Sequence, residues 1–364
     1  MNALQVFAGP VALQRLRERG LQPSDIRAIP AAAGGPKGLI LNPLDRFVFG
    51  HWLPRGAQVV HLLGASIGAW RMASACLPDA DAALAQLAED YITQRYEHAP
   101  GKAPKPRHVS EVFERKLAER FGGVEHEVLA NPRLRLHVFT SRGVRALARD
   151  GRVRTPLGYL GAFAWNAVSR QAMGGFLERV IFSDPRDALP VPTHDYRTQH
   201  VELGHANLAR SILASCTIPF WLEAVADIAG APPGPYWDGG ITDYHLHLDY
   251  AALHDDEAAA DAPGLVLYPH FQKTLVPGWL DKALKHRHRA SARLANVVLL
   301  APSPEWVATL PGAKIPDRGD FKAFGDDHAA REAAWRRATL ESARLADEFE
   351  ALTRRGGIDA LPLP

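Results

Sequence analysis

The chain has few cysteines and little net charge, and these low values exclude several classes of protein. Its 364 residues include two cysteines, Cys76 and Cys216, which are too few for a disulfide framework and lack metal-ligand spacing. Both lie in apolar surroundings, so we expect buried thiols. The formal net charge is only +2, which gives no argument for nucleic-acid binding.

Long hydrophobic runs are also missing. No stretch approaches the ~20 apolar residues that a transmembrane helix requires. The first ten residues carry neither the basic segment nor the apolar core of a signal peptide. We therefore expect a cytoplasmic protein. With 47% hydrophobic and 23% charged residues, the composition is that of a globular chain long enough for one large α/β domain.

Short apolar runs alternate with amphipathic segments along the chain, which predicts an α/β sandwich with a largely parallel sheet. No repeat or marked change in composition divides it. We expect one domain over residues 1–364, with a motif-bearing core at about 20–250 and further strands and helices over 251–364. The expected strands are 26–33 (the first), 58–63, 134–140, a short one ending at 238, 265–268 and 297–300. The expected helices are 11–20, 69–77, 79–96, 158–180, 282–293 and 326–355, with an exposed loop at 98–107.

The most informative stretch is Gly64-Ala65-Ser66-Ile67-Gly68, between an expected strand and an expected helix. A sharp strand-to-helix turn strains the backbone of the central serine and lifts it clear of the sheet, and flanking glycines leave room for the crossing. The helix N-terminus adds unpaired N–H groups where negative charge would develop. We interpret the stretch as a nucleophile elbow. The alternative is a glycine-rich turn whose serine caps the helix.

Three further segments fit a hydrolase. In 33–38 (Ala-Gly-Gly-Pro-Lys-Gly), glycines let backbone N–H groups approach a substrate oxygen, as an oxyanion hole requires. A phosphate-binding loop or a plain turn is the alternative, although the spacing is not that of a P-loop. In 237–241 (Trp-Asp-Gly-Gly-Ile), the aspartate can face a cleft, although such a sequence is also a common turn. In 214–220 (Ala-Ser-Cys-Thr-Ile-Pro-Phe), Pro219 can shape a pocket wall.

Taken together and in this order, the four segments resemble the patatin-like phospholipase family over about residues 28–243. The family's motifs are Gly-Gly-Gly-x-Arg/Lys-Gly, Gly-x-Ser-x-Gly, Ala-Ser-x-x-x-Pro and Asp-Gly-Gly/Ala. Ala33 stands where the family has its first glycine, and Pro36 offers no N–H. The resemblance implies a three-layer α/β/α sandwich and a serine acyl hydrolase that cleaves carboxylic esters of lipids.

The resemblance also implies the role of each motif residue. Ser66 would be the nucleophile and Asp238 the general base of a Ser–Asp dyad, acting through an acyl-enzyme. The N–H of Ile67 would help to hold the oxyanion. The oxyanion loop would contain Gly34, Gly35 and Gly38, and the remaining motif positions are Lys37, Gly64, Gly68, Gly239 and Gly240. We expect neither a cofactor nor a metal ion.

Two other functions stay open. A histidine after Asp238 would fit the Ser–Asp–His chain order of an α/β-hydrolase esterase, and His245, His247, His254 and His270 form the densest group of histidines. No histidine lies in a motif of its own, and surface or hydrogen-bonded histidines are common. The second alternative is an inactive acyl- or lipid-binding protein on the same fold.

Residues 282–293 are strongly basic and contain Lys282 and Arg293 at their ends. We expect a solvated helix face here. Lysines and arginines can also attract anionic lipid, so a weak membrane-surface contact is the alternative. The expected partners are thus a lipid or other acyl-ester substrate, with no nucleic acid.

Overall fold

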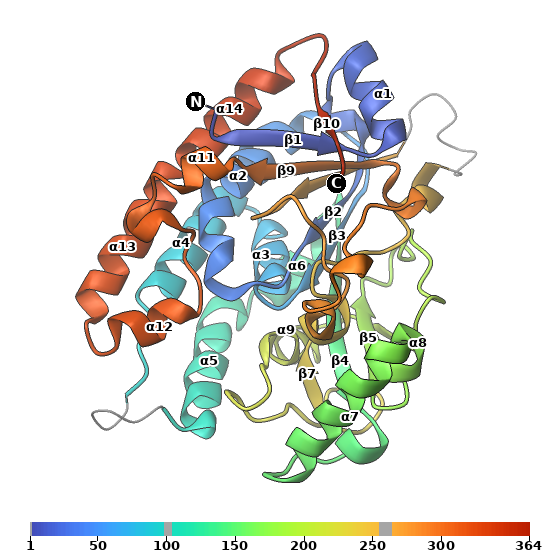
Figure 1. The fold of residues 1–364 in the computed structure, drawn as a ribbon, viewed down its shortest axis with the longest axis vertical. Coiled ribbons are helices and arrows are strands. Elements are labelled where there is room, and N and C mark those ends of the chain that lie inside the picture. Colours follow the sequence, from blue (N-terminus) through green and yellow to red (C-terminus); the bar gives the residue numbers. More distant parts are fainter. Residues whose placement is uncertain (1, 98–103, 255–263) are drawn as a thin grey trace.

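The computed structural model describes residues 2–97, 104–254 and 264–364 (Figure 1). It is a three-layer α/β/α sandwich with a mixed, mostly parallel central sheet, as the sequence predicts. No helix within the described residues is both long and apolar enough to cross a membrane.

The described residues contribute ten strands to the sheet. The strands are β1 (Leu4–Ala8), β2 (Ile26–Ala31), β3 (Val60–Ala65), β4 (Leu134–Gly143), β5 (Leu177–Ser183), β6 (Thr198–Glu202), β7 (Tyr236–Asp238), β8 (Leu265–Pro269), β9 (Val297–Pro302) and β10 (Leu361–Pro362). Their order is β10-β1-β9-β8-β2-β3-β4-β5-β6, and β7 pairs with β4 outside this path. The central strands β9, β8, β2, β3 and β4 are parallel to one another, whereas β1 is antiparallel to β9, and both β5 and β7 are antiparallel to β4.

Helices cover both faces of this sheet. They are α1 (Pro10–Arg19), α2 (Asn42–Phe47), α3 (Ile67–Ala75), α4 (Ala80–Ile92), α5 (Pro106–Phe121), α6 (Glu125–Ala130), α7 (Arg154–Val168), α8 (Arg170–Met173), α9 (Leu208–Cys216), α10 (Gly240–Asp243), α11 (Pro304–Val307), α12 (Gly319–Phe324), α13 (His328–Glu341) and α14 (Ala343–Thr353). Helices α2, α3, α4, α13 and α14 contact one another in series, and α3 packs on β2, β3 and β4. At the other end of the molecule, α7 and α8 lie side by side near β5 (Figure 1).

The central strands are buried throughout most of their length, because helices cover both of their faces. Their sequences are correspondingly apolar on successive residues, as in Val297-Val298-Leu299-Leu300 of β9, whose members are at most 1% exposed. Parallel strands β2 and β3 end at the same edge of the sheet, at Ala31 and Ala65. The loop after β2 and the turn after β3 therefore meet at this edge, which is where ligands bind in open α/β sheets.

The structure corrects one expectation about a strand and one about a helix. Residues 26–33 do not hold the first strand, because β1 precedes them and β2 ends at Ala31. Residues 158–180 are not one helix. Helical structure ends at Met173, two glycines, Gly174 and Gly175, follow it, and β5 begins at Leu177. Glycine is a poor helix former and commonly ends helices, so the pair gives the break a physical cause.

Two helix expectations also change. The expected helix 326–355 is interrupted at Ser342, whose hydroxyl donates to the carbonyl oxygen of Thr339. The basic run 282–293 is not an α-helix and holds only short 3₁₀ turns, at Lys285–Arg287 and Ala292–Leu294. Within it, the guanidinium of Arg287 bonds to Asp281 rather than lying along a solvated helix face. Of the expected loop 98–107, residues 98–103 lie outside the described residues, and α5 begins at Pro106.

Candidate active site

Ser66 occupies the turn between β3 and α3. Its backbone has φ 57° and ψ −130°, a strained conformation for a residue with a side chain. The side chain is almost fully buried, at 3% exposure. The sequence expectation of a strand, a sharp turn and a helix at this point is confirmed.

The glycines around Ser66 are required by close backbone contacts. A Cβ on Gly64 would lie 2.4 Å from the Cα of Ala69, and one on Gly68 would lie 1.9 Å from the carbonyl oxygen of Ala31. Strand β3 and helix α3 therefore approach each other, and α3 approaches β2, more closely than any side chain allows. These contacts hold the strained turn in place.

Asp238 meets Ser66 at the end of β7. The Oγ of Ser66 donates a hydrogen bond to Oδ2 of Asp238 over 2.6 Å, although 172 residues separate the two in the sequence. The other carboxylate oxygen, Oδ1, accepts from the N–H of Gly240 at 2.7 Å, and the N–H of Asp238 donates to the carbonyl of Thr217. The carboxylate is thus held at both oxygens and by its backbone.

Close packing also requires glycine at the two positions after Asp238. A Cβ on Gly239 would lie 2.0 Å from the carbonyl oxygen of Phe139 in β4, and one on Gly240 would lie 2.5 Å from the Cβ of Ala33. Since Ala33 begins the loop after β2, these contacts bring that loop against the aspartate.

Burial raises the pKa of Asp238, because a carboxylate is less stable away from water. The positive charge of Arg318 and the hydrogen bonds from Ser66 and Gly240 oppose this shift. A carboxylate in contact with a serine hydroxyl and with a raised pKa is a better proton acceptor than an ordinary surface aspartate.

A hollow of about 60 Å³ opens beside Ser66, and its lining includes Gly35, Ile67, Arg318 and the ring of Phe113. Ile67 is the first residue of α3, so its N–H has no partner in that helix. Gly35 has φ +58° and begins a 3₁₀ turn, Gly35–Leu41. Neither N–H donates to another of the described residues. The two N–H groups are therefore free for an oxygen placed in the hollow.

The other loop residues singled out in the sequence lie differently. Gly34 and Gly38 do not line the Ser66 hollow: a Cβ on Gly34 would press on the Phe271 ring, and Gly38 packs against Ile67. Their role in an oxyanion loop stays a prediction. The ammonium of Lys37 lies 4.9 Å from the centre of the Phe271 ring, in a separate and larger cavity that Lys282 also lines.

Two residues at the site were not assigned a role from the sequence. Ser215, in α9, accepts the N–H of Ser66 at its Oγ over 2.8 Å and donates to the carbonyl of Phe139 over 2.7 Å. Ser215 is the serine of the Ala-Ser-x-x-x-Pro segment, so the sequence did contain a motif that could have indicated its role. Arg318 comes from just before α12 and carries no local motif. Only the fold brings it to Ser66 and Asp238.

No histidine among the described residues forms a hydrogen bond with Ser66 or Asp238. His245 and His270 are fully buried, and the Nδ1 of His245 accepts the N–H of Val276. Burial lowers the pKa of His270 to about 3 and that of His247 to about 4. The described histidines therefore give no geometric support to a triad.

Both cysteines are buried free thiols, as expected. Cys216 lines the Ser66 hollow, and burial raises its pKa well above the ordinary value, so its thiol stays protonated near neutral pH. In the described part of the chain, no group of three or more His, Cys, Asp or Glu side chains is arranged to hold a metal ion.

Comparison of the chain with models of known protein families gives no match, and comparison with curated proteins gives no match either.

Proposed function

We propose that the protein is a serine acyl hydrolase of the patatin-like kind, which cleaves carboxylic esters of lipids through Ser66 and Asp238. The observation that carries this proposal is the 2.6 Å hydrogen bond between a serine in a strained strand-to-helix turn and a buried aspartate. A serine hydroxyl is a weak nucleophile until a base within hydrogen-bond reach removes its proton.

The proposed reaction has two halves. Asp238 takes the hydroxyl proton as the Oγ of Ser66 bonds to the ester carbonyl carbon, and the carbonyl oxygen becomes an oxyanion. The N–H groups of Gly35 and Ile67 stabilise that oxyanion. The tetrahedral intermediate collapses, and the departing alkoxide receives the proton from Asp238, which leaves an acyl-enzyme. Water then attacks the acyl carbon with Asp238 as base, and Ser66 is released with its proton restored.

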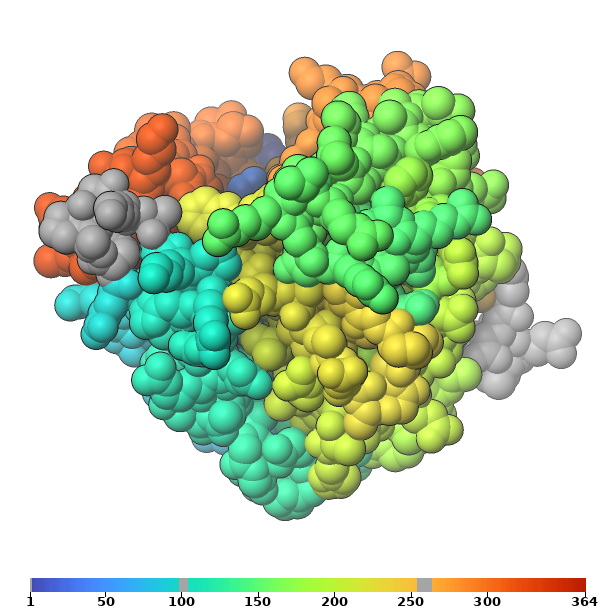
Figure 2. All heavy atoms as spheres, turned by 90° about the horizontal axis from the view of Figure 1, so that it is seen from below, coloured from blue at the N-terminus to red at the C-terminus, as the bar shows by residue number. Residues whose placement is uncertain are grey.

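A lipid substrate is supported by an exposed apolar face next to the site. On α7, Leu157, Leu160, Trp165 and Val168 are 53–75% exposed, and Phe163 is 40% exposed. Phe220 and Trp221 are also more than half exposed, and these seven residues make up what we call the apolar face. In Figure 2, α7 (green) lies on the surface beside the segment around residue 220 (yellow).

Ring contacts connect the apolar face to the dyad. Phe220 packs edge-on against Tyr159 of α7, with ring centres 5.8 Å apart, and Tyr159 packs against Trp237, the neighbour of Asp238. Before and at the start of α7, four exposed arginines accompany one exposed aspartate: Arg145, Arg149, Arg152, Arg154 and Asp150. Apolar side chains flanked by cations are typical of segments that lie on an anionic membrane surface.

The hollow beside Ser66 is much smaller than the ~300–1,000 Å³ of most ligand pockets. It can hold the reacting ester group, whereas a long acyl chain would need the surrounding side chains to move. We therefore propose that short acyl esters react without rearrangement, and that long-chain lipids react best at a membrane surface.

A fluorophosphonate probe and an ester panel test the proposal. The wild type should be labelled at Ser66 and should hydrolyse p-nitrophenyl esters, and Ser66→Ala should do neither. Phospholipid vesicles and lysophospholipid complete the panel and identify the substrate class. Labelling of another serine, or no labelling of the folded protein, would overturn the proposal and favour an inactive acyl-binding protein.

A further inference from the structure

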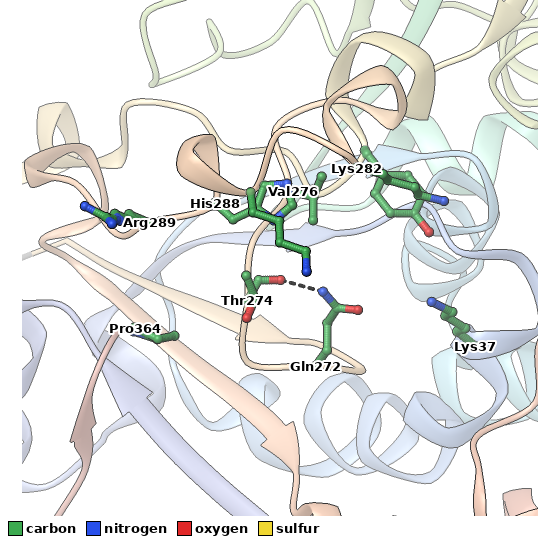
Figure 3. Close-up of a pocket in the computed structure, with 10 residues that line it drawn as sticks. Lys37, Gln272, Thr274, Val276, Lys282, His288, Arg289 and Pro364 are labelled. Atoms are coloured by element: carbon green, nitrogen blue, oxygen red, sulfur yellow. Dashed lines mark hydrogen bonds between the residues drawn. The ribbon is translucent and has the colours of Figure 1, made fainter.

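A second cavity, of about 630 Å³, is drawn in Figure 3; the loop that follows β2 contributes Lys37 to this cavity and Gly35 to the Ser66 hollow. Lys37 enters it from that loop, and Tyr244 from the end of α10. The rest of its wall comes from the segment after β8, which includes Gln272, from the basic run that begins at Lys282, and from Pro364. Its size is that of a small-molecule site rather than of a gap between side chains.

The wall of this cavity is strongly cationic. It includes Lys37, Lys282, Lys285, His288 and Arg289, and it includes no aspartate or glutamate. None of the three lysines, nor Arg289, forms an ion pair with another described residue. In Figure 3, Lys37 and Gln272 direct their polar ends toward the same open space, and Arg289 lies at the far rim.

Aromatic rings, instead of carboxylates, hold two of these lysines. The ammonium of Lys282 lies 4.2 Å from the centre of the Tyr244 ring, and that of Lys37 lies 4.9 Å from the centre of the Phe271 ring. Such contacts orient an ammonium without neutralising it. Each ammonium therefore keeps its charge and N–H donors for another partner.

The unneutralised charges repel one another. Desolvation by the surrounding protein lowers the pKa of Lys282 to about 8, with the positive charges of Lys37 and Arg318 adding to the effect. The pKa of Lys37 is also lowered, chiefly by burial, although Asp317 opposes this. A ligand of opposite charge would remove the repulsion.

We propose that this cavity is a binding site for a phosphate-bearing ligand with several negative charges, held by Lys37, Lys282 and Lys285. A single small anion would fill little of the space, so the ligand is larger than inorganic phosphate. Phosphate oxygens accept hydrogen bonds from several cations at once, whereas a neutral ligand would leave the repulsion in place. This site requires no ester hydrolysis and stands apart from the proposed function.

The cavity is electrically coupled to the dyad, because the charge of Lys282 acts on Asp238. Two sources can supply the same phosphate chemistry. A free phosphorylated molecule would bind as a separate ligand, and a lipid headgroup would bind as part of a molecule held in a membrane.

The test compares two double variants of the full-length chain. Lys282→Gln with Lys285→Gln removes two exposed cavity charges. The control, Arg17→Gln with Arg115→Gln, removes two exposed charges on α1 and α5, outside the cavity. Calorimetry measures the binding of pyrophosphate and inositol hexakisphosphate, and co-sedimentation measures binding to phosphatidylcholine vesicles that contain phosphatidate. A third variant, Lys282→Arg with Lys285→Arg, keeps the charge and should keep binding.

We expect the wild type and the control to bind, and the cavity variant to bind at least tenfold more weakly. If this pattern is seen with the phosphatidate vesicles but not with the soluble phosphates, it would support the site and identify a lipid headgroup as the source. Failure of the wild type to bind any of the three probes would overturn the proposal. Equal weakening in the cavity variant and the control would overturn it as well, because general surface charge would then explain the binding. None of these readouts depends on catalysis, so a failure of the proposed hydrolysis is seen separately.

Discussion

The backbone N–H of Ser66 donates to the Oγ of Ser215, which in turn donates to the carbonyl of Phe139 in β4. The strained turn after β3 is thereby tied to α9 and, through it, to the neighbouring strand. In the same segment, the carbonyl oxygen of Ser215 accepts a hydrogen bond from the N–H of Gly239. The carbonyl oxygen of Thr217 accepts one from the N–H of Asp238. One short stretch of chain therefore fixes both members of the proposed dyad.

Ser215→Ala should lower kcat about tenfold with little change in KM, because the substitution loosens the Ser66 turn without touching the substrate. Ser211→Ala is the matched control: Ser211 is equally buried in α9, but its hydroxyl bonds only to the carbonyl of Leu208. Steady-state kinetics on a soluble ester would measure both. An equal loss of activity in the two variants would mean that α9 matters only for stability.

Asp238→Asn should remove nearly all hydrolysis, since an amide cannot accept the Ser66 proton. Its melting temperature should not fall, because burial already disfavours the ionised carboxylate. Single changes to Asn at His245, His247, His254, His270, His286, His288 and His328 should each leave most activity in place. A histidine variant that folds normally but is as inactive as Ser66→Ala would contradict the dyad and favour a triad.

The pH–rate profile should show an acid limb. Asp238 must be ionised to act as a base, and its pKa is raised above the ordinary 3.8, so kcat/KM should fall as the pH decreases through a midpoint above that value. Arg318 favours the ionised form, so Arg318→Gln should move the midpoint to higher pH. A midpoint that stays fixed or moves down in this variant would show that another group controls the profile.

Gly35→Ala should reduce kcat about tenfold or more on soluble esters, with KM nearly unchanged. The added Cβ would lie 3.2 Å from both Nε of Arg318 and the hydroxyl of Tyr91, at a backbone φ of +58°. Gly123→Ala serves as control, because Gly123 also has positive φ but open space around its Cβ position. If Gly35→Ala changed KM alone, the loop would contribute to substrate binding rather than to the transition state.

Leu160→Gln with Trp165→Gln should weaken sedimentation with phosphatidylcholine–phosphatidylserine vesicles several-fold and leave hydrolysis of a soluble ester intact. Leu340→Gln is the control, since Leu340 is equally exposed on a different helix. Analytical ultracentrifugation should find the same oligomeric state in all three proteins. A wild-type dimer that the double variant converts to monomer, without any vesicle binding, would assign the apolar face to a second copy of the chain instead.

The parts of the site that were predictable from sequence are those set by local sterics. A glycine on each side of Ser66 is needed wherever a strand and a helix cross this closely, so the motif itself indicates the turn. The pairing of Ser66 with Asp238 has no such local signal, because it depends on β7 joining β4. It was anticipated only through the resemblance of four ordered segments to one family.

Other features could not be predicted from the sequence, because contacts with distant segments determine them. Arg318 reaches the hollow only through the packing of the segment before α12. The basic run from Lys282 has helix-forming composition, yet the hydrogen bonds of Arg287 and His288 with Asp281 favour short turns. The strand β1 was missed because its five residues carry no alternation strong enough to stand out without its partners.

The position of β1 has a consequence for how the protein acquires its structure during synthesis. In the sheet, β1 is separated from β2 by β8 and β9, which the ribosome makes long afterwards, and it also pairs with β10. Strand β1 therefore cannot form its pairs with β9 and β10 until the segments that carry Ser66 and Asp238 have been made. Pairings between residues so far apart in sequence form slowly and leave apolar strands open to association in the interval. Strand β1 is followed at once by α1, whose second half carries Arg15, Arg17, Glu18 and Arg19, and charged residues that flank an apolar strand disfavour its association with other chains.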